Sequence, residues 1–325
     1  MKFPPFGHLL LALIGTSLAL AQTPPSRVTV PAPAKPKVSR PPTHANVAYG
    51  AHERQVLDFY QASSAKPTPL LFFIHGGGWV TGDKANPGEL ETCLRAGISV
   101  VSINYRYAWQ AQLAGVMPPV QWPLEDAARA LQFVRSKARE WNLDKQRIAA
   151  SGGSAGACSS LYLAFHDDLA DPTSPDPIAR ESTRLWCAAV NGAQTSLDPK
   201  QLIEWTPNSR YGGHAFGFMD PNNLKTRDTR FAEFLAKRES VLKWIQTYSP
   251  YEHVSAGDPP VYLRYNDQPA LGQPQKDPTH TSNYGLPLQA HCRQLGVECE
   301  LAYPGAPDVK HRTLADFLIA RLLAP

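Results

Sequence analysis

The chain has 325 residues, of which 43% are hydrophobic and 18% are charged, so it has enough apolar material for a full core and too little charge for a disordered chain. Its formal net charge is +4, from 32 basic and 28 acidic residues. No block of lysine or arginine stands out, so we expect no nucleic-acid partner. No second apolar run of about 20 residues follows the N-terminal one, so we expect no membrane-spanning helix beyond the N-terminus.

The N-terminus has the pattern of a secretory signal. Lys2 precedes an apolar stretch that ends in small residues at Ala21, as a signal peptidase requires, whereas a membrane anchor would need a longer run. The proline-rich segment that follows cannot bury a core and predicts an extended linker. We therefore expect a signal peptide at 1–21, a linker at 22–44 and a folded domain at 45–325, in a secreted or periplasmic protein.

From residue 46 the chain alternates short apolar runs with helical patterns. The continuous apolar run at 70–74 suits a central strand that is buried on both faces. A helix that begins at Pro123 has acids in its first turn, where the helix dipole favours them. The predicted strands are 46–50, 55–60, 70–74, 98–103, 147–150, 186–190, 261–265 and 299–303. The predicted helices are 123–141, 159–165, 286–295 and 313–323. This alternation predicts a mostly parallel sheet with helices on both faces.

One long interval interrupts the alternation. Residues 193–258 contain no strand candidate, but they contain several aromatic residues and one amphipathic helix around 229–246. A long excursion from an α/β sheet is usually a functional cap, and aromatic side chains are suited to line an apolar pocket or to stack on a sugar. The expected pocket residues are Trp79, Trp205, Tyr211 and Phe216.

Two glycine-rich motifs carry the chemistry. The run from Gly152 through Ser154 to Gly156 matches the nucleophile elbow Gly-x-Ser-x-Gly, in which a sharp strand-to-helix turn exposes the serine hydroxyl. A strand pattern precedes it and an apolar helix pattern follows it, as this motif requires. The second motif is His75-Gly-Gly-Gly78, directly after the strand at 70–74. Glycines there let backbone N–H groups approach a developing oxyanion.

With these motifs the chain resembles an α/β-hydrolase of the His-Gly-Gly-Gly esterase type, close to hormone-sensitive-lipase-like esterases and to feruloyl and acetyl-xylan esterases. The resemblance also draws on Gly82-Asp-Lys84 and Asn104-Tyr-Arg-Tyr107. It implies an α/β-hydrolase fold with a cap, a serine mechanism without a cofactor, and oxyanion donors that fall on Gly77, Gly78 and Ala155. Many relatives carry aspartate before the serine, where this chain has Gly153.

The other members of a catalytic triad are harder to place. An α/β-hydrolase orders them as serine, acid and histidine. Asp267 follows the strand at 261–265 and is the expected acid, with Asp258 and Asp277 as rivals. His311 is the only histidine after the last predicted strand and is the expected base, with His280 as the alternative.

Metal chemistry has no support in the sequence. The chain has neither a Cys-x-x-Cys pair nor a His-Glu-x-x-His element, so we expect no metal site and no cofactor. Of the five cysteines, Cys292 and Cys299 are the only two close enough in sequence to suggest a disulfide. The oligomeric state is left open.

We therefore predict a secreted serine esterase for small or carbohydrate-linked esters. Two alternatives stay open, a serine peptidase of the same fold and a non-catalytic carbohydrate-binding relative. A panel of p-nitrophenyl esters and amino-acid anilides separates the first alternative, and a fluorophosphonate probe separates the second.

Overall fold

The computed structural model describes residues 40–324, so the predicted signal peptide and most of the predicted linker lie outside the described residues. The strands are β1 (His44–Ala48), β2 (Val56–Tyr60), β3 (Thr68–Ile74), β4 (Ser99–Ile103), β5 (Leu143–Gly153), β6 (Cys187–Asn191), β7 (Val261–Arg264) and β8 (Cys299–Ala302). The α-helices are α1 (Leu90–Arg95), α2 (Ala108–Leu113), α3 (Gln121–Ser136), α4 (Ala155–Phe165), α5 (Pro199–Trp205), α6 (Phe231–Ala236), α7 (Leu242–Tyr248), α8 (Pro250–His253), α9 (Gly285–Gln294) and α10 (Leu314–Leu322).

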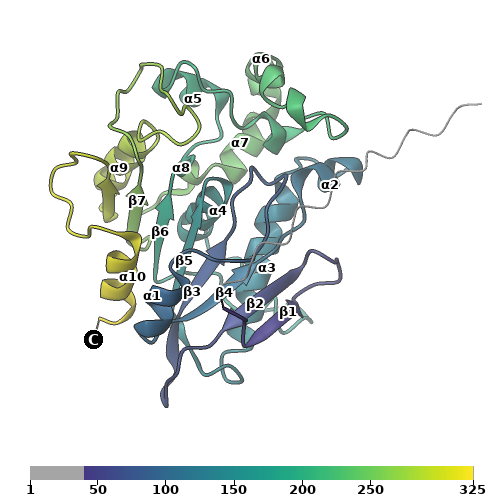
Figure 1. Ribbon diagram of the computed structural model, residues 1–325. Helices are drawn as coiled ribbons and strands as arrows, with labels where there is room; N and C mark the ends of the chain where they lie inside the picture. The colour runs from purple at the N-terminus through teal and green to yellow at the C-terminus, as the bar shows by residue number, and fades with distance from the viewer. Residues whose placement is uncertain (1–39, 325) are drawn as a thin grey trace, which may run out of the picture. The chain divides into compact units, whose positions relative to one another are not determined.

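The strands form one sheet in the order β1-β2-β4-β3-β5-β6-β7-β8 (Figure 1). The pairs β1–β2 and β2–β4 are antiparallel, and every later pair is parallel. Because parallel neighbours need crossover connections, helices cover both faces of the sheet. This architecture confirms the predicted mostly parallel sheet of an α/β-hydrolase.

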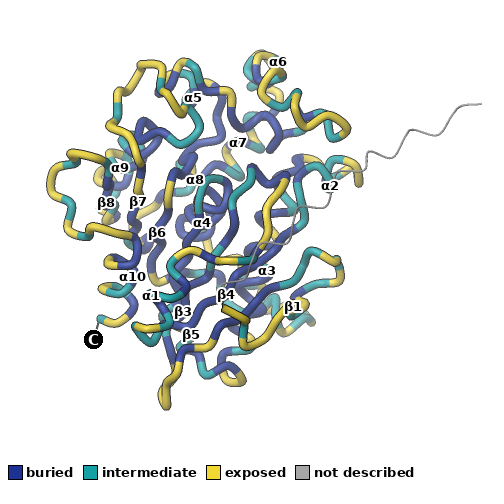
Figure 2. Tube along the Cα trace, in the orientation of Figure 1, coloured by how far each residue is buried: buried dark blue, intermediate teal, exposed yellow. Residues whose placement is uncertain are grey.

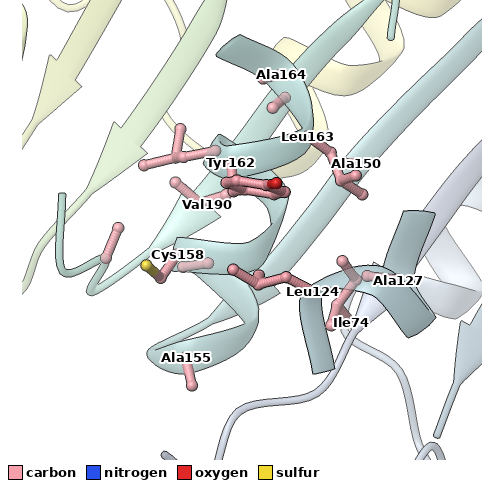
Figure 3. Packing of buried hydrophobic residues seen from close by; sticks show 14 of the residues in the cluster. Ile74, Leu124, Ala127, Ala150, Ala155, Cys158, Tyr162, Leu163, Ala164 and Val190 are labelled. Carbon is pink, nitrogen blue, oxygen red and sulfur yellow. The ribbon is translucent and has the colours of Figure 1, made fainter. Parts of the chain in front are cut away.

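Two apolar clusters lie on opposite faces of the sheet. One joins α3, α4 and α9 to strand residues such as Ile74, Ala150 and Val190 (Figure 3). The other joins α1 and α10 to the alternate strand residues, such as Leu71 and Ala149. The sheet is therefore the buried middle layer, as the tube coloured by burial shows (Figure 2). Continuous apolar strands such as β3 are explained by this position, because both of their faces are covered.

Residues 193–258 contain short helices and no strand. The single helix expected around 229–246 is broken into α6, a 3₁₀ turn at Arg238–Val241 and α7. In Figure 1, α5 and α6 lie at the end of the molecule opposite the C-terminus. None of the helices in residues 40–324 is long and apolar enough to cross a membrane.

Candidate active site

Ser154 lies at the turn between β5 and α4, with φ 54° and ψ −125°. A non-glycine residue at positive φ is strained, and such strain is typical of functional turns. The turn is tightly packed against β3, because a Cβ built at Gly152 or Gly156 would lie 2.3 Å or 2.0 Å from the backbone oxygen of Ile74. These two glycines let the elbow lie against the sheet and present the serine hydroxyl at its edge.

His280 is the histidine that reaches this hydroxyl. Its Nε2 lies 3.0 Å from Ser154 Oγ, and its Nδ1 lies 2.9 Å from Asp277 Oδ2. A carboxylate can only accept, so Nδ1 carries the hydrogen and Nε2 is left to accept the serine proton. Serine, histidine and aspartate therefore form a continuous chain of hydrogen bonds with the geometry of a catalytic triad.

Asp277 is kept ionised by its surroundings. Burial alone would raise the pKa of its carboxyl, but the His280 side chain and the backbone N–H groups of Thr279 and His280 outweigh burial and lower that pKa below its ordinary value. Both N–H groups donate to Asp277 Oδ1, at 3.1 and 3.2 Å. The acid is thus charged at neutral pH and can orient the imidazole.

The loop that carries both residues, 266–284, is held against neighbouring segments. Gln194 donates to the Thr279 carbonyl at 2.5 Å, and the Tyr284 hydroxyl donates to the Pro278 carbonyl at 2.5 Å. The His280 ring lies over Gly192, where a Cβ would come within 3.2 Å of His280 Cβ. The position of the histidine therefore depends on Gln194 and Gly192 outside its loop and on Tyr284 at the end of the loop.

The structure does not bring the expected base and acid to the serine. His311 Nδ1 lies 2.7 Å from Glu300 Oε2, and its backbone N–H donates to Glu300 Oε1 at 2.7 Å. Glu300 itself is buried on β8. Asp267 is exposed, and its backbone oxygen accepts from the Ser282 hydroxyl. The His311 ring is therefore bound to the buried carboxylate of Glu300 on β8 and not to Ser154.

The third acidic candidate, Asp258, has structural contacts as well. It accepts from the Ser255 N–H at 2.7 Å and contacts Arg184 at 3.5 Å. The pattern Asp277-Pro-Thr-His280 could have shown the pair in the sequence, because an aspartate three residues before a histidine can hold both a turn and the imidazole. His311 is expected instead because it follows the last predicted strand, whereas His280 lies before it; the order serine, acid, histidine fits both.

The loop expected to form the oxyanion hole lies beside Ser154. Gly77 and Gly78 have φ values of 96° and 61°, which glycine adopts without steric cost. A Cβ built at Gly76 would lie 3.4 Å from Ser154 Cβ. Ala155 is the first residue of α4. The expected donor residues thus belong to the two segments that meet at the serine.

A polar network holds this loop in place. The Tyr105 hydroxyl donates to the backbone oxygens of His75 and Gly76, at 2.9 and 3.1 Å. Asn104 accepts from the Lys84 N–H at 2.6 Å and donates to Asp83 Oδ2 at 2.9 Å. The Gly82-Asp-Lys84 and Asn104-Tyr-Arg motifs therefore brace the glycine loop against the end of β4.

A cavity of about 500 Å³ opens over the serine. Ser154 and His280 contribute to its wall, together with Gly76, Asp83 and residues from several other loops. Its remaining lining residues are Phe73, His75, Ala85, Asn86, Gly153, Asn191, Gly192, Tyr265, Asn266 and Asp277. Most of these are polar or small.

The aromatic residues expected to line the pocket are not part of this cavity. Trp79, Trp205, Tyr211 and Phe216 are all buried. Trp79 Nε1 donates to Ser159 Oγ at 2.9 Å, and the Phe216 ring packs 5.5 Å from that of Phe234. These side chains form the apolar core under the 193–258 segment, since a segment of this size needs a core of its own.

Two further histidines near the glycine loop are neutral. Burial lowers the pKa of His75 to about 4, and its Nδ1 lies 2.8 Å from the Gly76 backbone oxygen. Burial, with a smaller effect of the nearby Arg227 charge, lowers the pKa of His214 to about 3. His75 contributes to the cavity wall, but its buried ring stacks on Tyr105 and is neutral, and His214 is fully buried.

Neither a metal site nor a disulfide is seen in the part of the chain that the structure describes. No group of three or more His, Cys, Asp or Glu side chains is gathered there as metal ligands. All five cysteines are free thiols, including Cys292 and Cys299.

Comparison with known proteins identifies the family. The family model named BD-FAE matches residues 57–271. The chain belongs to the BD-FAE family. The match covers the glycine loop, the serine elbow and the whole 193–258 segment, and it ends before Asp277 and His280. The predicted resemblance to His-Gly-Gly-Gly esterases is confirmed.

Several curated proteins are similar to this BD-FAE chain over part of their length. Gut esterase 1 of Caenorhabditis elegans is 31% identical over 48% of this chain and 28% of its own length. Esterase LipC of Mycobacterium tuberculosis is 28% identical over 66% of this chain and 48% of its own length. The chain thus spans less than half the length of these relatives.

Solved structures share the fold at low sequence identity. A truncated carbohydrate esterase from gut microbiota superposes with a TM-score of 0.62 at 18% identity, over 86% of this chain and 96% of that one. An acetyl ester-xyloside bifunctional hydrolase from Caldicellulosiruptor lactoaceticus gives 0.55 at 22% identity, over 76% of both chains. These similarities confirm the α/β-hydrolase fold.

Proposed function

We propose that this chain is a serine carboxylic-ester hydrolase with Ser154 as nucleophile, His280 as base and Asp277 as the acid that orients it. The contact of 3.0 Å between Ser154 Oγ and His280 Nε2 carries the proposal, because a serine becomes nucleophilic when an adjacent base can take its proton. The similarity to proteins named esterases supports the same reaction class.

The reaction follows from the arrangement. Neutral His280 takes the Ser154 proton as Oγ attacks the ester carbonyl, and Asp277 stabilises the imidazolium that forms. The N–H groups of Gly77, Gly78 and Ala155 are the proposed donors to the oxyanion. His280 then protonates the departing alcohol oxygen. Water hydrolyses the acyl-enzyme by the same route, with no cofactor in any step.

The proposed substrates are small or carbohydrate-linked esters. The cavity over Ser154 is lined largely by carboxylate and amide side chains and by none of the four aromatics Trp79, Trp205, Tyr211 and Phe216, which favours a polar substrate over a long acyl chain. Two of the structural neighbours are described as an acetyl ester-xyloside hydrolase and a carbohydrate esterase. Export of the chain to the periplasm or medium belongs to the proposal, and a mature N-terminus at Gln22 would support it.

The test is hydrolysis of p-nitrophenyl acetate by four forms of the protein: the unaltered chain, Ser154→Ala, His280→Ala and His311→Gln. We expect the first two variants to lose on the order of 10⁴-fold in kcat or more, as removal of a triad member does. His311→Gln keeps a donor for Glu300 and is the matched control, with near-normal kcat.

A fluorophosphonate probe adds a readout that does not depend on substrate choice. It should label the unaltered chain at Ser154 and leave Ser154→Ala unlabelled. Full activity in His280→Ala with loss in His311→Gln would assign the base to His311 instead. No labelling and no ester hydrolysis would favour the non-catalytic alternative, and faster cleavage of amino-acid anilides than of esters would favour a peptidase.

A further inference from the structure

The cavity over Ser154 lies on the side of the leaving group. It is lined by His280 and Asp277, whereas Gly77 and Gly78 do not line it. Because His280 must deliver its proton to the departing alcohol oxygen, the alcohol half of the ester has to lie on the histidine side of the serine. The alcohol half of the ester is therefore expected to enter this cavity, where it meets the groups of the wall.

Asp83 is the carboxylate in this wall that the triad does not use. It is exposed, and two donors orient it, the Asn104 side chain at 2.9 Å on Oδ2 and the Ala85 N–H at 2.9 Å on Oδ1. Burial raises the pKa of its carboxyl, but these two hydrogen bonds and the nearby Lys84 charge outweigh burial and lower it. Each oxygen keeps a further lone pair for a ligand hydroxyl.

No lysine or arginine lies in the wall beside this carboxylate, among the described residues. The neighbouring Lys84 is turned away into a buried ion pair with Asp58, at 2.8 Å. The other carboxylate, Asp277, is engaged by His280. The wall also carries three asparagines, Asn86, Asn191 and Asn266, with Phe73 as an apolar surface, and the buried side chains of His75 and Tyr265.

We propose that Asp83 is a specificity-determining residue, whose carboxylate accepts hydrogen bonds from a neutral, polyhydroxylated alcohol and repels an alcohol that carries a carboxylate. This inference rests on the proposed ester hydrolysis. The combination of one oriented carboxylate, amide side chains and an aromatic ring suits hydroxyl groups and a C–H face of a sugar. A uronic acid ester in the same place brings two like charges together in a site without a counterion.

The experiment compares kcat/KM for three acetyl esters: an acetylated methyl xyloside, the corresponding acetylated methyl glucuronide, and p-nitrophenyl acetate, which has no hydroxyl. We expect the unaltered chain to prefer the xyloside to the glucuronide by about tenfold or more. Asp83→Asn should lower kcat/KM for the xyloside by about 10- to 100-fold, the usual effect of a lost hydrogen bond to a charged group. It should also remove most of the preference against the glucuronide.

The control is Asp171→Asn, because Asp171 also accepts from a backbone N–H two residues on, at 2.9 Å, but lies outside the cavity. It should leave all three rates unchanged. A second test uses the unaltered chain alone. Added salt should lower the ratio of kcat/KM for the xyloside to kcat/KM for the glucuronide, because salt screens the repulsion between exposed charges.

The outcomes separate this inference from the proposed function. Equal kcat/KM for xyloside and glucuronide in the unaltered chain, or a ratio unchanged by Asp83→Asn in a protein with normal thermal stability, would overturn the role of Asp83. In both cases p-nitrophenyl acetate would still be hydrolysed.

If the unaltered chain hydrolysed none of the three esters, the proposed function itself would be contradicted. Asn266→Ala, which removes an exposed amide of the same wall, should lower the xyloside rate alone.

Discussion

At the scale of single residues, the elbow shows how a missing side chain can be required. Gly156 lies in the first turn of α4, where alanine would ordinarily favour the helix by about 1 kcal/mol. Here a Cβ would meet the Ile74 backbone oxygen at 2.0 Å. Contact with rigid backbone outweighs helix propensity, so the site selects glycine for packing.

We therefore predict that Gly156→Ala lowers the free energy of unfolding by about 3 kcal/mol, the upper end of what overpacking costs, because the Cβ meets backbone. Gly153→Ala is the matched control, because the closest atom to a Cβ built at Gly153 is the Asn191 oxygen at 3.8 Å. Urea denaturation of both variants measures the difference. Equal stabilities would show that the elbow relaxes without cost. The open space at Gly153 also explains why relatives can carry aspartate there.

His280 lies over Gly192 in the same way, and Gly192 has φ 59°. A side chain at position 192 would displace the His280 imidazole from Ser154. Gly192→Ala should therefore lower kcat for ester hydrolysis by about tenfold or more, while KM changes little. Steady-state kinetics on p-nitrophenyl acetate checks this. An unchanged kcat would show that the loop at 266–284 adjusts freely.

At the scale of elements, the glycine loop is held by a tyrosine from the next strand connection. Tyr105→Phe removes the hydroxyl that donates to the His75 and Gly76 oxygens. We predict a fall in kcat of about tenfold with a small change in KM, because the oxyanion donors lose their support. Tyr262→Phe removes a hydroxyl that donates to the His311 carbonyl on another part of the chain and should keep the kcat.

The 193–258 segment is an element with an apolar core of its own. Phe216 is buried and contacts Phe234, so Phe216→Ala should lower the stability by about 3 to 5 kcal/mol. The preference among acyl chains from C2 to C12, measured where the variant is still folded, should not move. A shifted chain-length preference would return this residue to the substrate pocket.

At the scale of the whole molecule, two buried neutral histidines make stability depend on pH. An unfolded histidine titrates near 6.5, whereas burial lowers the pKa of His75 to about 4 and that of His214 to about 3. Below pH 6.5 the unfolded chain binds protons at these positions that the folded chain cannot bind. The free energy of unfolding should therefore fall as the pH drops from about 6.5 toward 4.

For His75 the difference between the two pKa values corresponds to about 3 kcal/mol. The lowered pKa values of Asp83 and Asp277 add a loss of the same sign at lower pH. Urea denaturation between pH 7 and pH 4 measures the slope. His214→Phe keeps a ring beside Trp79 and removes one titrating group, so its slope should be smaller. An equal slope in that variant would mean that His214 is protonated in the folded chain.

The sequence predicts the fold well and the site in part, for physical reasons. The eight strands are recognisable because a buried strand must be apolar, as in β3, and the glycine motifs are local in sequence. The short helices α1 and α2 are missed, because each has only six residues and little amphipathic pattern. His280 is ranked below His311 because its position depends on contacts with Gln194, Tyr284 and Gly192, which no local pattern records.

The separation of only three residues between Asp277 and His280 has a mechanical consequence. Acid and base belong to one turn, so any shift of that turn carries them together and leaves their mutual hydrogen bond intact. Ser154, the proposed nucleophile, belongs to the elbow at the edge of the sheet, and one hydrogen bond of 3.0 Å joins it to the turn. A displacement of the turn relative to the elbow would therefore break the His280–Ser154 contact first and leave the Asp277–His280 pair intact.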